Sequence, residues 1–141
     1  MQPKLIQHSR RCWRLPLTAL QLLLSRNTFW AQHRSLKELR KMLRGSQAVI
    51  SLWSENELVG FGRASSDGIY RAVLWDVVID ENHQGKGNGK LLLEALLNHP
   101  NLVEVERVYL MTTNQAGFYG ELGFEEIKSQ TLMGKGINKN Q

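Results

Sequence analysis

The chain has 141 residues, of which 42% are hydrophobic and 22% charged, and its net charge is +5 at pH 7. This length favours a single domain over residues 1–141, with segments of about residues 1–14 and 133–141 expected to be flexible, and no apolar run approaches the roughly 20 residues of a membrane-spanning helix. The single cysteine, Cys12, excludes an internal disulfide framework, and four scattered histidines predict no metal site.

The predicted elements begin with two helices. Residues 16–25 are rich in leucine and predict a largely buried helix with Pro16 in its first turn. Ser35 is followed three residues later by Glu38, which is a capping-box pattern, and apolar residues then recur at helical spacing until Gly45.

After Gln47 the pattern changes to that of strands. Residues 48–53 and 58–64 predict an antiparallel hairpin around a tight turn, and residues 71–80 are apolar enough on both faces to predict a strand at the centre of a sheet. The remaining prediction is a helix that begins near residue 91 and ends before Pro100, a strand at 107–112, a short helix at 115–122 closed by Gly123, and a final strand or pair of strands at 124–132.

The sharpest local signal is a loop with glycines at positions 85, 87 and 89, which joins the strand at 71–80 to the following helix. The first N–H groups of a helix have no partner inside it and carry partial positive charge, so they favour an anion. Glycine allows the backbone to approach that anion closely, and Lys86 and Lys90 add charge. The loop therefore predicts a phosphate site, with a glycine-rich turn that binds nothing as the alternative.

Two common phosphate motifs are excluded. A Walker loop needs Ser or Thr after Gly-Lys, whereas Leu91 follows Gly89-Lys90. A dinucleotide-binding fingerprint needs a third glycine one place later than the one found here.

The loop instead matches Q-x-x-G-x-G and resembles the motif with which the GNAT superfamily of N-acetyltransferases binds the pyrophosphate of acetyl-coenzyme A. A second segment, from Asn114 to Phe124, is similar to a later motif of the same family. Residues 29–32, 66–72, 75–79 and 107–113 resemble the plastid-type and cyanobacterial branch that includes serotonin (aralkylamine) N-acetyltransferases.

This resemblance covers about residues 15–127 and implies a fold of class α/β (α+β), the GNAT acyl-CoA N-acyltransferase fold, with a mixed, mostly antiparallel central sheet flanked by helices. It implies acetyl transfer from acetyl-coenzyme A to a primary amine by direct attack in a ternary complex. Arylalkylamines such as serotonin or tryptamine are the favoured acceptors, and protein lysine or N-terminal amines are the alternative. From other classes, an acetyl-coenzyme A-binding module without turnover and a basic RNA-associated protein remain alternatives.

The family's cofactor residues fall on two parts of this chain. Backbone amides of Val77 and Val78 are expected to receive the acetyl carbonyl and the pantetheine arm, and Asn114 is expected to bind pantetheine or orient the amine. The full expected set is Val77, Val78, Ile79, Gln84, Gly85, Lys86, Gly87, Asn88, Gly89, Lys90, Asn114, Phe118 and Tyr119.

Two residues are candidates for catalysis. Asp76 is a candidate base, because an acid within an apolar strand is costly to bury unless it faces a cleft or a partner. The alternative is a structural aspartate that caps a turn or pairs with an arginine. Tyr119 matches the family tyrosine that protonates the coenzyme A sulfur, with packing beside Phe118 as the alternative.

The expected amine site is aromatic. Phe29, Trp30 and Trp75, together with Asp76, are candidate substrate-binding residues, because stacking and cation–π contacts favour such rings around an arylalkylamine. Core packing is the alternative for at least one of them. A covalent acetyl-enzyme on Cys12 is not expected, since no paired base lies near it in sequence.

The positive charge is concentrated in the first third of the chain, where no acidic residue precedes Glu38. A basic face near an anionic cofactor or an acidic partner is favoured over a transit peptide or a nucleic-acid surface, because no groove-reading motif accompanies the charge. We expect neither a nucleic acid nor a membrane as partner. The family resemblance implies a homodimer as the expected assembly. A bacterial cytoplasm, or alternatively a plastid, is the expected compartment.

Overall fold

This computed structural model describes residues 2–8, 12 and 14–137. The chain divides into two compact units, residues 1–111 and residues 112–141, which we call the N-terminal and C-terminal units and describe separately. Among the described residues, no helix is both long and apolar enough to cross a membrane.

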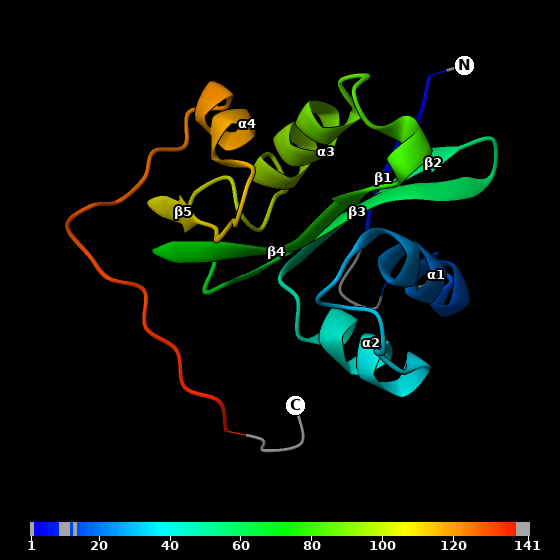
Figure 1. Ribbon diagram of the computed structural model, residues 1–141, viewed down its shortest axis with the longest axis horizontal. Helices are drawn as coiled ribbons and strands as arrows, with labels where there is room; N and C mark the ends of the chain where they lie inside the picture. The colour runs from blue at the N-terminus through cyan, green and yellow to red at the C-terminus, as the bar shows by residue number, and fades with distance from the viewer. Residues whose placement is uncertain (1, 9–11, 13, 138–141) are drawn as a thin grey trace. The chain divides into compact units, whose positions relative to one another are not determined.

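The N-terminal unit is built around a five-stranded sheet in which the strands follow their chain order (Figure 1). Strands β1 to β4 pair antiparallel, and β5 pairs parallel with β4. The sheet is therefore mixed and mostly antiparallel, as expected. Its strands are β1 (Lys4–Gln7), β2 (Ala48–Ser54), β3 (Glu57–Ser66), β4 (Arg71–Ile79) and β5 (Arg107–Tyr109).

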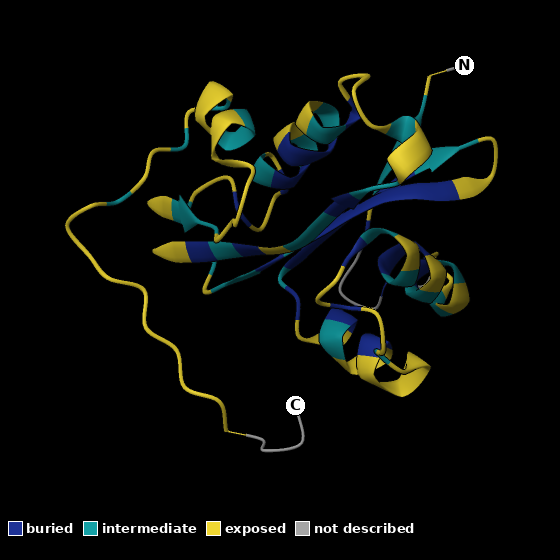
Figure 2. Cartoon of the chain, viewed as in Figure 1, coloured by how far each residue is buried: buried dark blue, intermediate teal, exposed yellow. Residues whose placement is uncertain are grey.

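Helices cover both faces of this sheet (Figure 1). α1 (Leu17–Asn27) and α2 (Leu36–Arg44) lie on one face, and α3 (Asn88–Leu97) lies on the other after a short 3-10 turn, η1 (Glu81–His83). Apolar side chains of α1, α2 and the sheet form one buried cluster, and Figure 2 shows the buried residues following the strands between the helices. The predicted fold class is confirmed.

Two local sequence signals fold as the sequence predicts. The Ser35 hydroxyl accepts from the Glu38 amide at 3.1 Å, and the Glu38 carboxylate accepts from the Ser35 amide at 2.7 Å, so the capping box is complete. Between β2 and β3, Glu55 and Asn56 have φ of 49° and 68°. Two successive residues in the left-handed region form the tight turn that matches the twist of a hairpin.

The C-terminal unit contains α4 (Ala116–Glu121), which ends in a glycine cap. Gly123 has φ of 94°, its amide donates to Gly120 O, and the Phe124 amide donates to Tyr119 O, both at 3.1 Å. These two bonds satisfy carbonyls at the end of the helix, as in a Schellman motif. The predicted helix and its closing glycine are confirmed.

One strand was missed, and two predictions about strands were wrong. β1 was not predicted, and it is a four-residue strand that pairs with the stretch Ile50–Trp53. β4 is not the centre of the sheet, because β3 occupies that place. Residues 124–132 form no strand in the described part of the chain, and they are largely exposed, so they have no buried face to present.

Candidate active site

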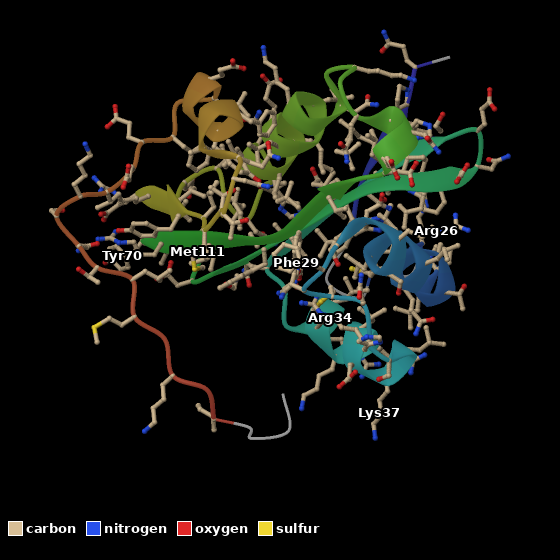
Figure 3. All side chains as sticks on the ribbon, in the orientation of Figure 1. Arg26, Phe29, Arg34, Lys37, Tyr70 and Met111 are labelled. Carbon is tan, nitrogen blue, oxygen red and sulfur yellow. The ribbon has the colours of Figure 1, made fainter. Side chains whose placement is uncertain are left out.

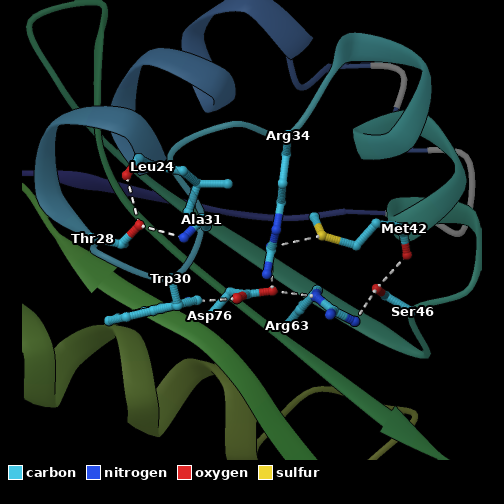
Figure 4. A network of polar contacts seen from close by, with 9 residues as sticks. All are labelled: Leu24, Thr28, Trp30, Ala31, Arg34, Met42, Ser46, Arg63 and Asp76. Atoms are coloured by element: carbon cyan, nitrogen blue, oxygen red, sulfur yellow. Dashed lines mark hydrogen bonds and ion pairs between the residues drawn. The ribbon is translucent and has the colours of Figure 1, made fainter. Parts of the chain in front are cut away.

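β4 contains a bulge at the residue that the sequence singles out. Phe61 pairs with Val78, whereas Arg63 pairs with Trp75, so Gly62 alone on β3 faces both Asp76 and Val77. Asp76 has φ of 53°, a left-handed conformation that is uncommon outside glycine. A bulge adds one residue to a strand and changes the direction of its side chain, and Figure 4 shows the Asp76 carboxylate turned toward two arginines.

The carboxylate of Asp76 has three donors. Trp30 Nε1 donates to Oδ1 at 2.9 Å, while Arg34 Nη1 and Arg63 Nε donate to Oδ2 at 2.9 and 2.8 Å. The Asp76 side chain is only 4% exposed. One acid thus joins the segment after α1 to strands β3 and β4.

These contacts keep Asp76 ionised. Burial alone would raise the pKa of this carboxyl, but hydrogen bonds from Arg34 and Arg63, the charge of Arg63 and the Trp30 indole together hold the pKa below its usual value. A carboxylate with a lowered pKa is a weak base toward an amine. The geometry therefore favours the alternative left open by the sequence, an aspartate paired with arginine.

The segment that carries Trp30 and Arg34 is anchored at both ends (Figure 4). Thr28 Oγ1 donates to Leu24 O at 2.8 Å and accepts from the Ala31 amide at 3.1 Å, which fixes the exit from α1. At the other end, Arg34 Nη1 lies 3.4 Å from the Met42 sulfur in α2. Hydrogen bonding at several points gives the Trp30 indole a fixed orientation.

Replacing Asp76 with asparagine should lower the free energy of unfolding by about 2 kcal/mol at pH 7, because two arginines lose a shared, largely buried anion. The native pKa is lowered, so this contribution is present above the unfolded value of 3.8 and is lost as pH falls through the native pKa. Urea denaturation at pH 7 and below pH 3.8 should show the difference shrink in acid. Glu94→Gln, at an exposed ion pair, is the control and should change stability little. An equal loss in both variants would contradict the assignment.

Two aromatic rings stand exposed next to the carboxylate. The Phe29 and Trp30 rings meet edge to face, with centroids 5.1 Å apart, and are 75% and 47% exposed. The third aromatic candidate differs, because the Trp75 indole donates to Ser65 Oγ on β3 at 2.8 Å. The structure thus groups Phe29 and Trp30 with Asp76 and turns the polar edge of Trp75 toward β3.

β4 is open along part of one edge. Its pairing with β5 extends from Arg71 to Val73, and within the described residues no strand pairs with residues 74–79 on that side. Backbone groups on an open strand edge can bond a ligand in extended conformation. Val77, Val78 and Ile79, predicted to contact the cofactor, lie along this edge.

The turn after β4, residues 84–90, has the conformation that an anion site requires; we call it the glycine turn. Gly85 and Gly87 have φ of 74° and 82°, and a Cβ added at either would meet no atom within 4 Å. The Leu91 amide donates to Gly87 O at 3.1 Å. Since this is the first bond of α3, the amides of residues 88–90 have no acceptor within the helix. Open space, free amides and two lysines fit a pyrophosphate group.

Polar side chains brace the glycine turn from within. Nδ2 of the buried Asn88 side chain donates to His83 O, and Nε2 of the Gln84 side chain donates to Ile79 O, both at 2.9 Å. Asn27 on α1 accepts from the Glu81 amide at 2.9 Å and donates to Asp80 at 3.3 Å. The side chains of Gln84 and Asn88 therefore position the turn, which leaves their backbone amides as the groups to contact a ligand.

Three further predicted residues belong to the C-terminal unit. Tyr119 packs between Phe118 and Phe124, with ring centroids 5.1 and 5.9 Å away. Burial raises the pKa of the Tyr119 phenol, so it stays protonated at neutral pH. Asn114 precedes the helix in the same unit. The predicted residues thus form two sets, each described within its own unit.

Sequence reasoning missed Arg34, Arg63 and Asn27. Arg63 had a signal, since it is a cation in an otherwise apolar or small stretch of β3, as Asp76 is an anion in the neighbouring apolar strand. Opposite charges inside adjacent buried strands favour a pair, because an unpaired buried charge is costly. Arg34 lies among exposed polar residues, and Asn27 is a polar residue at the end of a helix, so neither had a comparable signal.

Comparison with known proteins agrees with this geometry. A family model described as an acetyltransferase (GNAT) domain matches residues 17–139. The chain belongs to the GNAT acetyltransferase family. Its cofactor is accordingly acetyl-coenzyme A, and the glycine turn offers the groups that such a cofactor needs. A Xanthomonas campestris protein of the GNAT family has a similar crystal structure, with a TM-score of 0.81, 28% identity, and 97% of this chain and 96% of that chain covered.

Two plant relatives resemble this GNAT chain in sequence. Histone acetyltransferase TAP1 of Glycine max is 35% identical over 65% of this chain and 45% of its own length. Serotonin N-acetyltransferase 2, chloroplastic, of Oryza sativa subsp. japonica is 34% identical over 64% of this chain and 48% of its own length. The matches thus span about half the length of these relatives, and they agree with the plastid-type branch that the sequence motifs indicated.

Proposed function

We propose that this chain transfers the acetyl group of acetyl-coenzyme A to a primary amine by direct attack. The observation that carries the proposal is the glycine turn, with its free amides and open space, directly after a bulged and partly unpaired strand. When bound, the cofactor supplies the acetyl group as an activated thioester. Amides of residues 85–90, with Lys86 and Lys90, hold its diphosphate.

Residues of the chain position the reacting groups and transfer the protons. Amides of Val77 and Val78 receive the acetyl carbonyl and the pantetheine arm, and Asn114 orients pantetheine or the amine. Tyr119 donates its phenolic proton to the departing sulfur. Its raised pKa keeps the phenol protonated, and therefore neutral, at neutral pH. Water relays the proton of the attacking amine to solvent.

Direct attack is supported by the state of Cys12. Its side chain is buried, and burial raises the pKa of its thiol to about 11. A thiol must ionise to act as a nucleophile, so this cysteine is a poor carrier for an acetyl group at neutral pH.

Asp76 acts in this proposal as a positioning residue. It holds the Trp30 indole and Arg34 in place, and we call Phe29, Trp30 and Asp76 the acceptor wall. The Asp76→Asn variant separates this role from that of a base. A positioning aspartate alters KM for the amine and leaves kcat within about tenfold, whereas loss of a general base lowers kcat by about 10²–10⁴.

The exposed Phe29–Trp30 pair supports an arylalkylamine as one acceptor, because an aromatic acceptor can stack on these rings. The name of the rice relative points to the same class. A protein amine is the second candidate, supported by the open position of both rings and by the name of the soybean relative. The chloroplastic name of the rice protein supports a plastid as the compartment, which was the alternative to a bacterial cytoplasm.

A thiol-release assay with purified protein tests this function. Acetyl-coenzyme A should raise the melting temperature, and tryptamine or a lysine peptide should then accelerate thiol release with intersecting initial-rate patterns. Thermal stabilisation without thiol release for any amine would favour a binding module without turnover. Absence of both effects would leave the function unsupported, and parallel rate patterns would contradict direct attack.

A further inference from the structure

The outer face of α2 carries a row of cations. Lys37, Arg40, Lys41 and Arg44 follow helical spacings of three and four residues, so they share one side of the helix, while Leu39 and Leu43 lie buried on the other. All four cations are exposed. We call these four residues the basic stripe.

In the part of the chain that the structure describes, the basic stripe has no acidic partner. Within the described ranges, none of its four side chains takes part in an ion pair. The single acid of α2, Glu38, is engaged in the capping box with Ser35. Charges of one sign on one helix face, without compensation, attract a partner of the opposite sign.

The stripe begins where the acceptor wall ends. Arg34 contacts Asp76 at the wall, Ser35 caps α2, and Lys37 is the first cation of the stripe. In Figure 3, Lys37 extends from α2 away from the sheet, and Arg34 lies between α2 and the sheet. α2 has nine residues and is about 13 Å long, which an extended peptide of about four residues would span.

A polar hollow adjoins this region. A depression of about 520 Å³ lies between the outer face of α1 and the segment that leads into α2. Among the described residues its lining has no acidic side chain and includes Arg34, so it suits polar or anionic groups better than an aromatic ring. The lining residues are Thr18, Gln21, Leu22, Ser25, Gln32, His33, Arg34 and Ser35.

We propose that the basic stripe docks an acidic segment of a protein acceptor, so that an amine beside that segment reaches the acceptor wall. The proposal rests on the proposed acetyl transfer and names its macromolecular substrate class, a protein whose target amine is flanked by Asp or Glu. The stripe provides the charge that such a segment needs, and the hollow provides room for polar side chains next to the wall.

The test compares two peptides that differ in charge alone. Each has one lysine followed by four residues, all glutamate in one peptide and all glutamine in the other. With wild-type protein, KM should be about tenfold lower for the glutamate peptide at low salt, with similar kcat, and the difference should shrink as salt screens the charges. Equal KM values for the two peptides would overturn the proposal.

Two triple variants that lose the same charge test whether the preference for the glutamate peptide depends on the basic stripe. Lys37→Gln/Lys41→Gln/Arg44→Gln should raise KM for the glutamate peptide to that for the glutamine peptide and leave turnover of tryptamine unchanged. The control, Lys4→Gln/Arg107→Gln/Lys128→Gln, removes the same charge at exposed positions outside α2 and should retain the preference. An equal effect in both variants would mean that net charge, not the stripe, attracts the peptide.

A direct binding measurement tests the docking surface separately from the proposed acetyl transfer. Fluorescence anisotropy of a labelled glutamate peptide should show binding that the α2 variant weakens about tenfold. Binding without acetylation of any amine would retain the docking surface and contradict the proposed transfer. Acetylation of tryptamine without preference for, or binding of, the glutamate peptide would contradict the docking surface alone. Tight binding of a single-stranded RNA instead of the glutamate peptide would contradict it as well.

Discussion

Replacing Gly87 with aspartate should lower the affinity for acetyl-coenzyme A by at least about a hundredfold, because it places a carboxylate beside the diphosphate, where like charges cost several kcal/mol. The site has room for the new side chain, since a Cβ there would meet nothing within 4 Å. The loss would therefore arise from charge rather than from a steric clash. Calorimetric titration with the cofactor measures the change.

Asparagine at the same position is the matched control for Gly87→Asp. Gly87 has φ of 82°, and asparagine and aspartate both tolerate left-handed backbone better than most residues. The two side chains have nearly the same shape and differ in charge. Gly87→Asn should keep the affinity within about tenfold of wild type; a similar large loss in both variants would assign the effect to backbone strain.

Tyr119→Phe should lower kcat by about a hundredfold and leave the dissociation constant of acetyl-coenzyme A nearly unchanged, because it removes a proton donor and keeps the ring. The phenol packs between Phe118 and Phe124, and phenylalanine preserves those contacts. Single-turnover kinetics of thiol release, with the cofactor affinity measured separately, give the two quantities.

Phe118→Leu is the control for Tyr119→Phe, since it alters packing in α4 and keeps the phenol. Because Phe118 is itself expected to contact the cofactor, kcat is compared at saturating acetyl-coenzyme A, and a loss in Phe118→Leu at least as large as in Tyr119→Phe would assign Tyr119 a packing role. The pH profile offers a second readout. Burial raises the pKa of Tyr119, so the donor is present at neutral pH and activity should decline only at strongly alkaline pH, an alkaline limb that Tyr119→Phe lacks.

Local signals predicted most of the elements correctly. The capping box at Ser35 and Glu38 fixed the start of α2, and the closing glycine at Gly123 fixed the end of α4, because both patterns depend on hydrogen bonds between residues close in sequence. The glycine turn was predicted for the same reason. Its positive φ values at Gly85 and Gly87 follow from residue type and neighbourhood.

Features that depend on distant partners could not be predicted in this way. β1 is short, and it is a strand because it pairs with a segment more than 40 residues away. The partners of Asp76 come from a loop and from a neighbouring strand, so the sequence could show that the acid was unusual but not which residues met it. The bulge at Asp76 depends on the register between β3 and β4, which no local pattern determines.

The extra residue in β4 constrains the length of this strand as well as its composition. Leu74 pairs with Ala64 and Val78 pairs with Phe61, positions that face opposite sides of the sheet, although two residues an even number apart would normally share a side. One strand thereby supplies buried side chains to the layers on both faces, with Val78 in the cluster beneath α1 and α2. Deleting a single residue between Trp75 and Val78 would restore regular alternation and move Val78 to the wrong layer. A homologous chain can therefore exchange side chains along β4 more readily than it can gain or lose a residue there.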